Sequence, residues 1–110
     1  MDTTVEQIEL TIEQAQASVD LGKALERLSQ NPDFRKVIRE GYFEKEPVRL
    51  VRLKAAPAMA NEASQAAILK DIDAIGSLYQ YFGAIELVAD QAQGAISDGE
   101  EAIAEMALED

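Results

Sequence analysis

Apolar residues recur along the first thirty positions with steps of three and four. This first seam comprises Val5, Ile8, Ile12, Ala15, Val19 and Gly22. Steps that alternate between three and four residues fit a helix and no other regular structure. A second apolar stripe is predicted to widen the same face toward the end of this helix. Its members are Leu10, Ala17, Leu21, Ala24 and Leu28.

Both ends of this first helix carry boundary signals. Thr3 or Thr4, followed three residues later by Glu6 or Gln7, fits a capping box. The helix is expected to end near Gln30, because a proline at position 32 disfavours helical geometry in the residue before it.

Residues 31–57 predict a compact corner made of two short helices. Asn31 is the expected N-cap of the first, with Pro32 at its first position and Gly41 as its left-handed C-cap. The second restarts at Glu46-Pro47, and Pro57 closes it. Its expected buried residues are Val48, Leu50, Val51 and Leu53, and the expected buried plugs of the corner are Phe34 and Phe43.

From Asn61 to the end the pattern is again helical. The second seam comprises Ile68, Ile72, Ile75, Tyr79, Phe82, Ile85, Ala89, Ala92, Ile96, Gly99, Ile103 and Met106. Glycines lower helix stability, so breaks are expected at Gly83 or around Gly99. The chain is therefore predicted to be a single all-α domain over residues 1–110. It would form a long antiparallel helical hairpin with coiled-coil-like arms (1–30 and 61–110) around the two-helix corner.

Charge is divided sharply along this architecture. All ten Lys and Arg residues lie between Lys23 and Lys70, and seven of them fall in residues 31–57. Residues 1–22 carry a net charge of −5 and residues 71–110 a net charge of −10. The arms must therefore be held by their apolar seam, without salt bridges between them. Three explanations remain open: a solvated acidic surface, contact with a basic partner, and self-association in which cationic corners meet acidic arms.

Several kinds of chemistry have no support in this sequence. The chain has neither His nor Cys, so the commonest metal ligand, the usual near-neutral base and the thiolate nucleophile are missing. Asp71 and Asp73 point to different helix faces. We therefore expect no enzyme activity, no metal and no cofactor. No apolar run approaches the roughly 20 residues needed to cross a bilayer, and the acidic N-terminus does not resemble a signal peptide, which together favour a soluble protein of a reducing compartment.

The candidate binding residues are charged or aromatic, and Tyr81 among them is expected to lie off the seam. On the corner they are Arg35, Lys36, Arg39, Arg49 and Arg52; on the last helix they are Tyr81, Glu100, Glu101 and Glu105. Cations with interleaved aromatics can grip nucleic acid. Acidic residues interrupt the corner, however, and its small positive charge favours protein partners instead.

Part of the chain resembles a family of small helical proteins encoded by tailed bacteriophages. The resemblance covers about residues 21–85 and leaves the acidic C-terminal arm outside. The residues that carry it are 31–38 (NPDFRKVI), Gly41-Tyr42-Phe43, Arg49-Leu50-Val51, Pro57-Ala58-Met59, Ala74-Ile75-Gly76 and Tyr81-Phe82. It implies a phage origin more than a mechanism.

These observations predict a non-enzymatic structural or assembly protein, such as a virion component, scaffold or adaptor. Its expected partners are other phage proteins and further copies of itself. The expected location is the host cytoplasm during infection, with incorporation in the virion as a further option. The alternative is an acidic inhibitor that imitates nucleic acid and occupies the DNA- or RNA-binding surface of a host protein.

Overall fold

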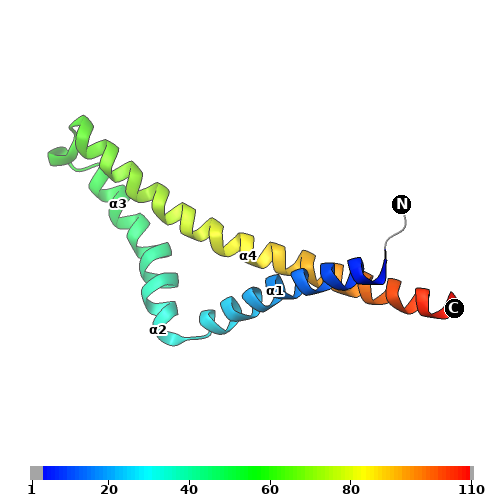
Figure 1. Ribbon diagram of the computed structural model, residues 1–110. Helices are drawn as coiled ribbons and strands as arrows, with labels where there is room; N and C mark the ends of the chain where they lie inside the picture. Colours follow the sequence, from blue (N-terminus) through cyan, green and yellow to red (C-terminus); the bar gives the residue numbers. More distant parts are fainter. Residues whose placement is uncertain (1–3, 110) are drawn as a thin grey trace. The chain divides into compact units, whose positions relative to one another are not determined.

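The computed structural model describes residues 4–109 and is helical almost throughout, with no strand in that range (Figure 1). This confirms the predicted all-α class. The elements are α1 (Val5–Ser29), α2 (Pro32–Phe34), the π-helical η1 (Arg35–Lys45), α3 (Glu46–Lys54), the 3-10 helix η2 (Pro57–Met59) and α4 (Glu62–Glu109). Their contacts form two compact units. Unit 1 contains α1 up to Glu26 and α4 from Ala84, and unit 2 contains residues 27–83. The single domain over residues 1–110 stays a prediction.

Helix α1 begins with the predicted capping box. The backbone N–H of Gln7 donates to Thr4 Oγ1 at 3.1 Å, and the backbone N–H of Thr4 donates to Gln7 Oε1 at 2.9 Å. The two residues therefore satisfy each other's free backbone donors at the helix start. The alternative with Thr3 falls outside the described residues. At the other end, α1 stops at Ser29, close to the predicted boundary.

Unit 1 is an antiparallel pair of helices held by the first seam. Its core is formed by Val19, Ala92 and Ile96, with Ile12 and Ala15 packed against it. A Cβ atom on Gly22 would lie 2.5 Å from the Cβ of Ala89. Further along the pair, a Cβ on Gly99 would lie 3.0 Å from the side chain of Ile12. Position 22 thus meets 89 while 12 meets 99, which shows that the two helices run in opposite directions.

The second stripe of α1 does not widen this seam, and that prediction was wrong. Its first four residues each follow a seam position by two, as Leu10 follows Ile8 and Leu21 follows Val19. At 3.6 residues per turn, a step of two turns the side chain by about 200°. The stripe therefore lies on the opposite face of α1, and its leucines are largely exposed.

In unit 2, residues 32–54 form one continuous helical segment, not the two short helices expected from the sequence. Asn31 caps it as predicted, because its Oδ1 accepts from the backbone N–H groups of Asp33 (2.9 Å) and Phe34 (3.1 Å). Gly41 does not end a helix, since no glycine in the described residues has a positive φ. The backbone instead widens into η1, where the N–H of Glu46 donates to Gly41 O, five residues back. This wider bonding accommodates Pro47, which lacks an N–H and would crowd an α-helical carbonyl.

The core of unit 2 forms where α3 packs against the first half of α4. Leu50 is 1% exposed and packs with Ile68 and Ile75. Half-buried residues surround this cluster: Tyr42, Phe43, Leu53, Met59 and Ile72. Two of the four expected core residues of α3 are exposed, since Val48 and Val51 face solvent.

The aromatic residues of unit 2 also differ from expectation. Phe34 and Phe43 are half-buried, not fully buried. Tyr79 is mostly exposed, although its ring meets the edge of Phe43 with centroids 5.3 Å apart. Leu78 is half-buried at the position that the seam assigned to Tyr79.

The side chain of Gln65 forms hydrogen bonds to the segment that connects α3 and α4. Its Nε2 donates to the carbonyl of Lys54 at 2.9 Å and to that of Met59 at 2.7 Å. Asn61 caps α4 by accepting from the N–H of Ser64 at 2.8 Å. Helix α4 then continues without interruption to Glu109, so the expected breaks at Gly83 and Gly99 do not occur.

Candidate protein-binding surface

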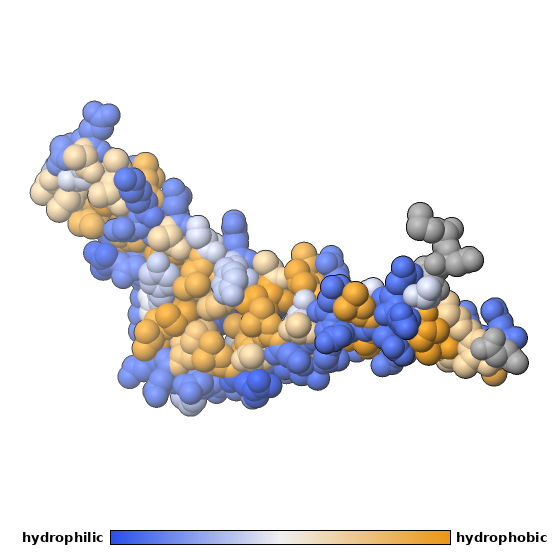
Figure 2. Space-filling view, viewed as in Figure 1, coloured by the Kyte–Doolittle hydropathy of each residue, from blue (hydrophilic) through white to orange (hydrophobic). Residues whose placement is uncertain are grey.

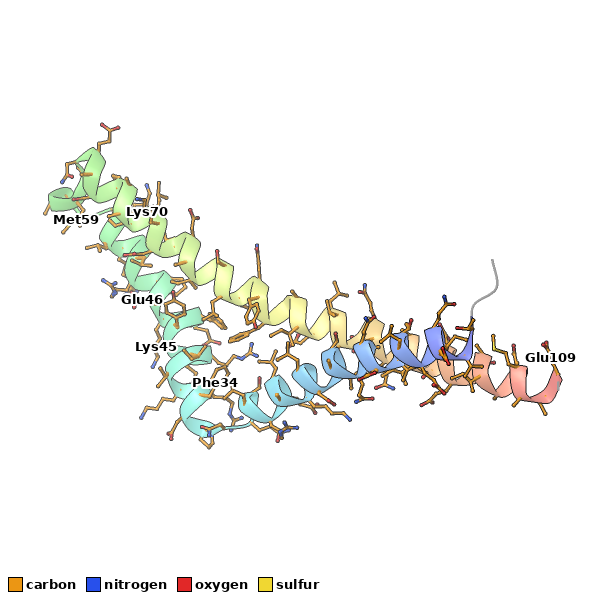
Figure 3. The ribbon with its side chains drawn as sticks, in the orientation of Figure 1. Phe34, Lys45, Glu46, Met59, Lys70 and Glu109 are labelled. Carbon is orange, nitrogen blue, oxygen red and sulfur yellow. The ribbon has the colours of Figure 1, made fainter. Side chains whose placement is uncertain are left out.

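The exposed side of α3 combines apolar and cationic side chains. Two shallow hollows lie along it, and both are lined by Val48 and Arg52. The residues that line these hollows are Glu44, Lys45, Pro47, Val48, Arg49, Val51 and Arg52, and we call this surface the α3 face. Figure 3 labels Lys45 and Glu46 at the junction of η1 and α3, where this face begins.

The α3 face is apolar along its centre and positive along its edges. Val51 is 63% exposed and Val48 48% exposed, although both are aliphatic residues on a well-formed helix. Residues 44–54 hold four cations and two carboxylates, a net charge of +2. Figure 2 shows hydrophobic and hydrophilic residues interspersed over the surface of the molecule.

One carboxylate on α3 already has a partner. Arg49 Nε donates to Glu46 Oε1 one turn away, and this is the single ion pair within residues 4–109. Arg52 and Lys45 have no such pair. They therefore remain available to an incoming carboxylate, whereas Arg49 would have to share its charge.

The predicted binding residues of η1 divide into an exposed pair and an internal one. Arg35 and Lys36 are exposed, as a partner-binding role requires. Arg39 is half-buried, and its Nη2 donates to Ser29 Oγ at 3.1 Å. Its charge is therefore engaged inside unit 2, which leaves less of it for a partner.

The Arg39 guanidinium lies among three aromatic rings. Its central carbon is 5.8 Å from the centroid of Phe34, 5.9 Å from that of Phe43 and 5.5 Å from that of Phe82. The rings also pack on one another, with centroids of Phe43 and Phe82 5.8 Å apart. In a π-helix, two side chains that are five residues apart lie more nearly on the same side of the helix than they do in an α-helix. The widened turn of η1 thereby helps to bring Arg39 over Phe34.

The remaining predicted residues are exposed, and each lies within a single unit. In unit 2, Tyr81 is 56% exposed, and its ring is tilted against that of its neighbour Phe82, with centroids 6.1 Å apart. In unit 1, Glu100, Glu101 and Glu105 are exposed near the end of α4. Glu101 and Glu105 are four residues apart and share a face.

Sequence reasoning found the cations of the α3 face but missed its valines. Val48 and Val51 were assigned to the core because they are large and aliphatic, while helical spacing alone allowed either assignment. No local signal separates them from the core residue of the same helix, because the buried Leu50 is followed by Lys54 at the same spacing at which Val48 is followed by Arg52.

Among residues 4–109 there is no group of three acidic side chains placed to hold a metal ion. No helix in this range is long and apolar enough to span a bilayer. Comparison with protein families, with curated proteins and with solved structures found no match to the chain. The exposed helix faces are therefore the basis for any functional proposal.

Proposed function

We propose that this chain is a non-enzymatic structural or assembly protein of a tailed bacteriophage, acting as a virion component, scaffold or adaptor. The observation that carries the proposal is the α3 face, where the exposed Val48 and Val51 share a surface with Lys45 and Arg52, which form no ion pair. Exposed apolar surface rimmed by charge is typical of protein-binding sites. The phage assignment rests on the sequence resemblance over residues 21–85.

The expected partner of the α3 face is another phage protein with an acidic, leucine-bearing helix. Apolar side chains would cover Val48 and Val51, and carboxylates would meet Lys45 and Arg52. Such a contact would give affinity through burial and orientation through charge. Arg35, Lys36 and Tyr81 offer further exposed contacts in the same unit.

The test is complementation of a phage that lacks this protein. Val51→Asp is expected to reduce incorporation of the protein into assembling particles by at least about tenfold, because it places a charge in the apolar centre of the face. Val37→Asp is the matched control: Val37 is 65% exposed, against 63% for Val51, and lies outside the hollows. Equal incorporation of both variants, with helicity preserved, would remove the α3 face from the proposal.

A second candidate function is supported by the acidic arms. The exposed carboxylates of α4, including Glu100, Glu101 and Glu105, form no ion pair within the described residues. A dense anionic helix surface could occupy the DNA- or RNA-binding surface of a host protein. This candidate predicts capture of a basic host protein that weakens steeply with added salt. A partner whose affinity is insensitive to salt would exclude it.

A further inference from the structure

Besides its buried seam, α1 carries a second heptad seam, which lies opposite Ile12 and Val19 and runs beside the buried Leu25 at its C-terminal end. Its positions alternate in steps of four and three along the single helix Val5–Ser29. They are Leu10, Gln14, Ala17, Leu21, Ala24 and Leu28. Leu10, Leu21 and Leu28 are 55%, 48% and 44% exposed, so the leucines of this seam are largely uncovered, while Ala24 is half-buried. An apolar heptad seam of this kind is the surface that a coiled-coil partner covers.

We infer that this outer seam of α1 binds the α1 of a second copy of the chain, in antiparallel orientation, to form a closed two-fold dimer. When the second copy of the seam runs in the opposite direction, larger residues of one copy lie beside smaller residues of the other at its central positions. Leu10 of one copy then lies beside Leu28 of the other, Gln14 beside Ala24, and Ala17 beside Leu21. A single polar position such as Gln14 helps to specify register in such pairs.

The charges of α1 favour the antiparallel orientation. Its C-terminal half holds two cations, Lys23 and Arg27, and two acids, Asp20 and Glu26, whereas its N-terminal half holds Glu6, Glu9 and Glu13 and no cation. Reversal of one copy therefore places the acidic half opposite a half with no net charge, while a parallel pair would place the two acidic halves together.

One specific charge pair follows from this register. Glu13 flanks the seam between positions 10 and 14, and Arg27 flanks it between positions 24 and 28. In the antiparallel dimer, positions 10 and 14 of one copy lie beside positions 28 and 24 of the other. Glu13 of each copy therefore meets Arg27 of the other. Asp20 meets its own symmetry mate near the two-fold axis, and Lys23, one turn away on the same helix, offsets that repulsion. Two attractive pairs thus outweigh one screened repulsion.

The buried seam of unit 1 leaves room for this contact. Helix α4 covers the opposite side of α1, through Val19, Ala92 and Ile96. Leu10 and Leu21 are therefore exposed in unit 1 and Leu28 is exposed in unit 2, and pairing of the seam would bury these leucines of both copies. This closed contact uses the same patch twice and does not extend into a filament.

The first measurement is the mass of the full chain by size-exclusion chromatography with light scattering. The wild type is expected at twice the 12.0 kDa of one chain. Leu21→Glu is expected to weaken dimerisation by at least about 100-fold, because it buries two carboxylates beside the two-fold axis. Leu87→Glu is the control, since Leu87 is similarly exposed (59%) but lies on α4, and it should remain dimeric. A monomeric wild type at the highest soluble concentration, or a dimer that survives Leu21→Glu, would overturn the inference.

The second measurement tests orientation. The chain has no Cys, so Glu13→Cys and Arg27→Cys chains can be mixed and oxidised cleanly. The antiparallel dimer predicts a disulfide between the two different chains, whereas like-with-like disulfides would contradict it. As a charge test, Glu13→Arg is expected to weaken the dimer by about tenfold. The swap Glu13→Arg with Arg27→Glu should restore it, and failure of that rescue would contradict the register.

This inference deepens the proposed oligomeric assembly role, but the two fail separately. A monomer that is still incorporated into particles would refute the dimer alone. A dimer that is absent from particles would refute the phage assembly role alone.

Discussion

At the scale of single residues, the contacts of Arg39 indicate that this cation stabilises the fold of unit 2 more than it offers charge to a partner. It donates to Ser29 and lies within 6 Å of three aromatic ring centroids. Cation–π contacts of this kind contribute about 0.5–2 kcal/mol, and the aliphatic stem of arginine adds packing. The sequence placed Arg39 among the binding residues because nothing in its immediate neighbours distinguishes it from Arg35.

Arg39→Ala is therefore expected to lower the free energy of unfolding by about 1–3 kcal/mol. Arg35→Ala, at an exposed position four residues earlier, should change it by less than about 0.5 kcal/mol. Urea unfolding followed by circular dichroism measures both values. Similar values for the two variants would show that the aromatic contacts contribute little to stability.

At the scale of elements, unit 1 depends on the close approach of α1 and α4. Gly22 permits this approach, because a Cβ there would lie 2.5 Å from that of Ala89. Gly94 has no atom within 4 Å of the corresponding position, although it lies in the same helix pair. The close packing of the two helices therefore requires a glycine at position 22 but not at position 94.

Gly22→Ala is expected to destabilise the protein by about 1–3 kcal/mol, since Ala89 is too short to move aside and the helices must separate. Gly94→Ala should instead stabilise it by about 1 kcal/mol, through higher helix propensity in open space. Thermal unfolding by circular dichroism gives the sign of each change. Stabilisation by both substitutions would contradict the close packing of the pair.

The helix boundaries at Ser29, Lys54 and Asn61 could be predicted because Asn and Pro act locally. The π-helical turn could not be predicted. It depends on Pro47 together with the packing of Phe34, Phe43 and Arg39, which are joined only once the chain folds. Gly41 was misassigned for the same reason, since a glycine fits both a C-cap and a helix interior.

At the scale of the whole molecule, the buried and the exposed apolar surfaces lie on different faces of the helices. The core seam of α1 holds unit 1, and the leucines of its outer seam are exposed, where we propose that a second copy binds. The α3 face presents cations and valines in unit 2. The candidate cations were predictable from charge segregation, whereas the free apolar surfaces were not. Hydrophobic spacing shows that a face is apolar but not which neighbour covers it.

The central claim is that these free surfaces serve the assembly of phage particles. Quantitative mass spectrometry of purified proheads and mature particles tests it most directly, because proheads retain scaffold proteins that mature particles lose. We predict many copies of this chain per particle in at least one of the two preparations. Its absence from both, in infected cells that contain the protein, would contradict the claim.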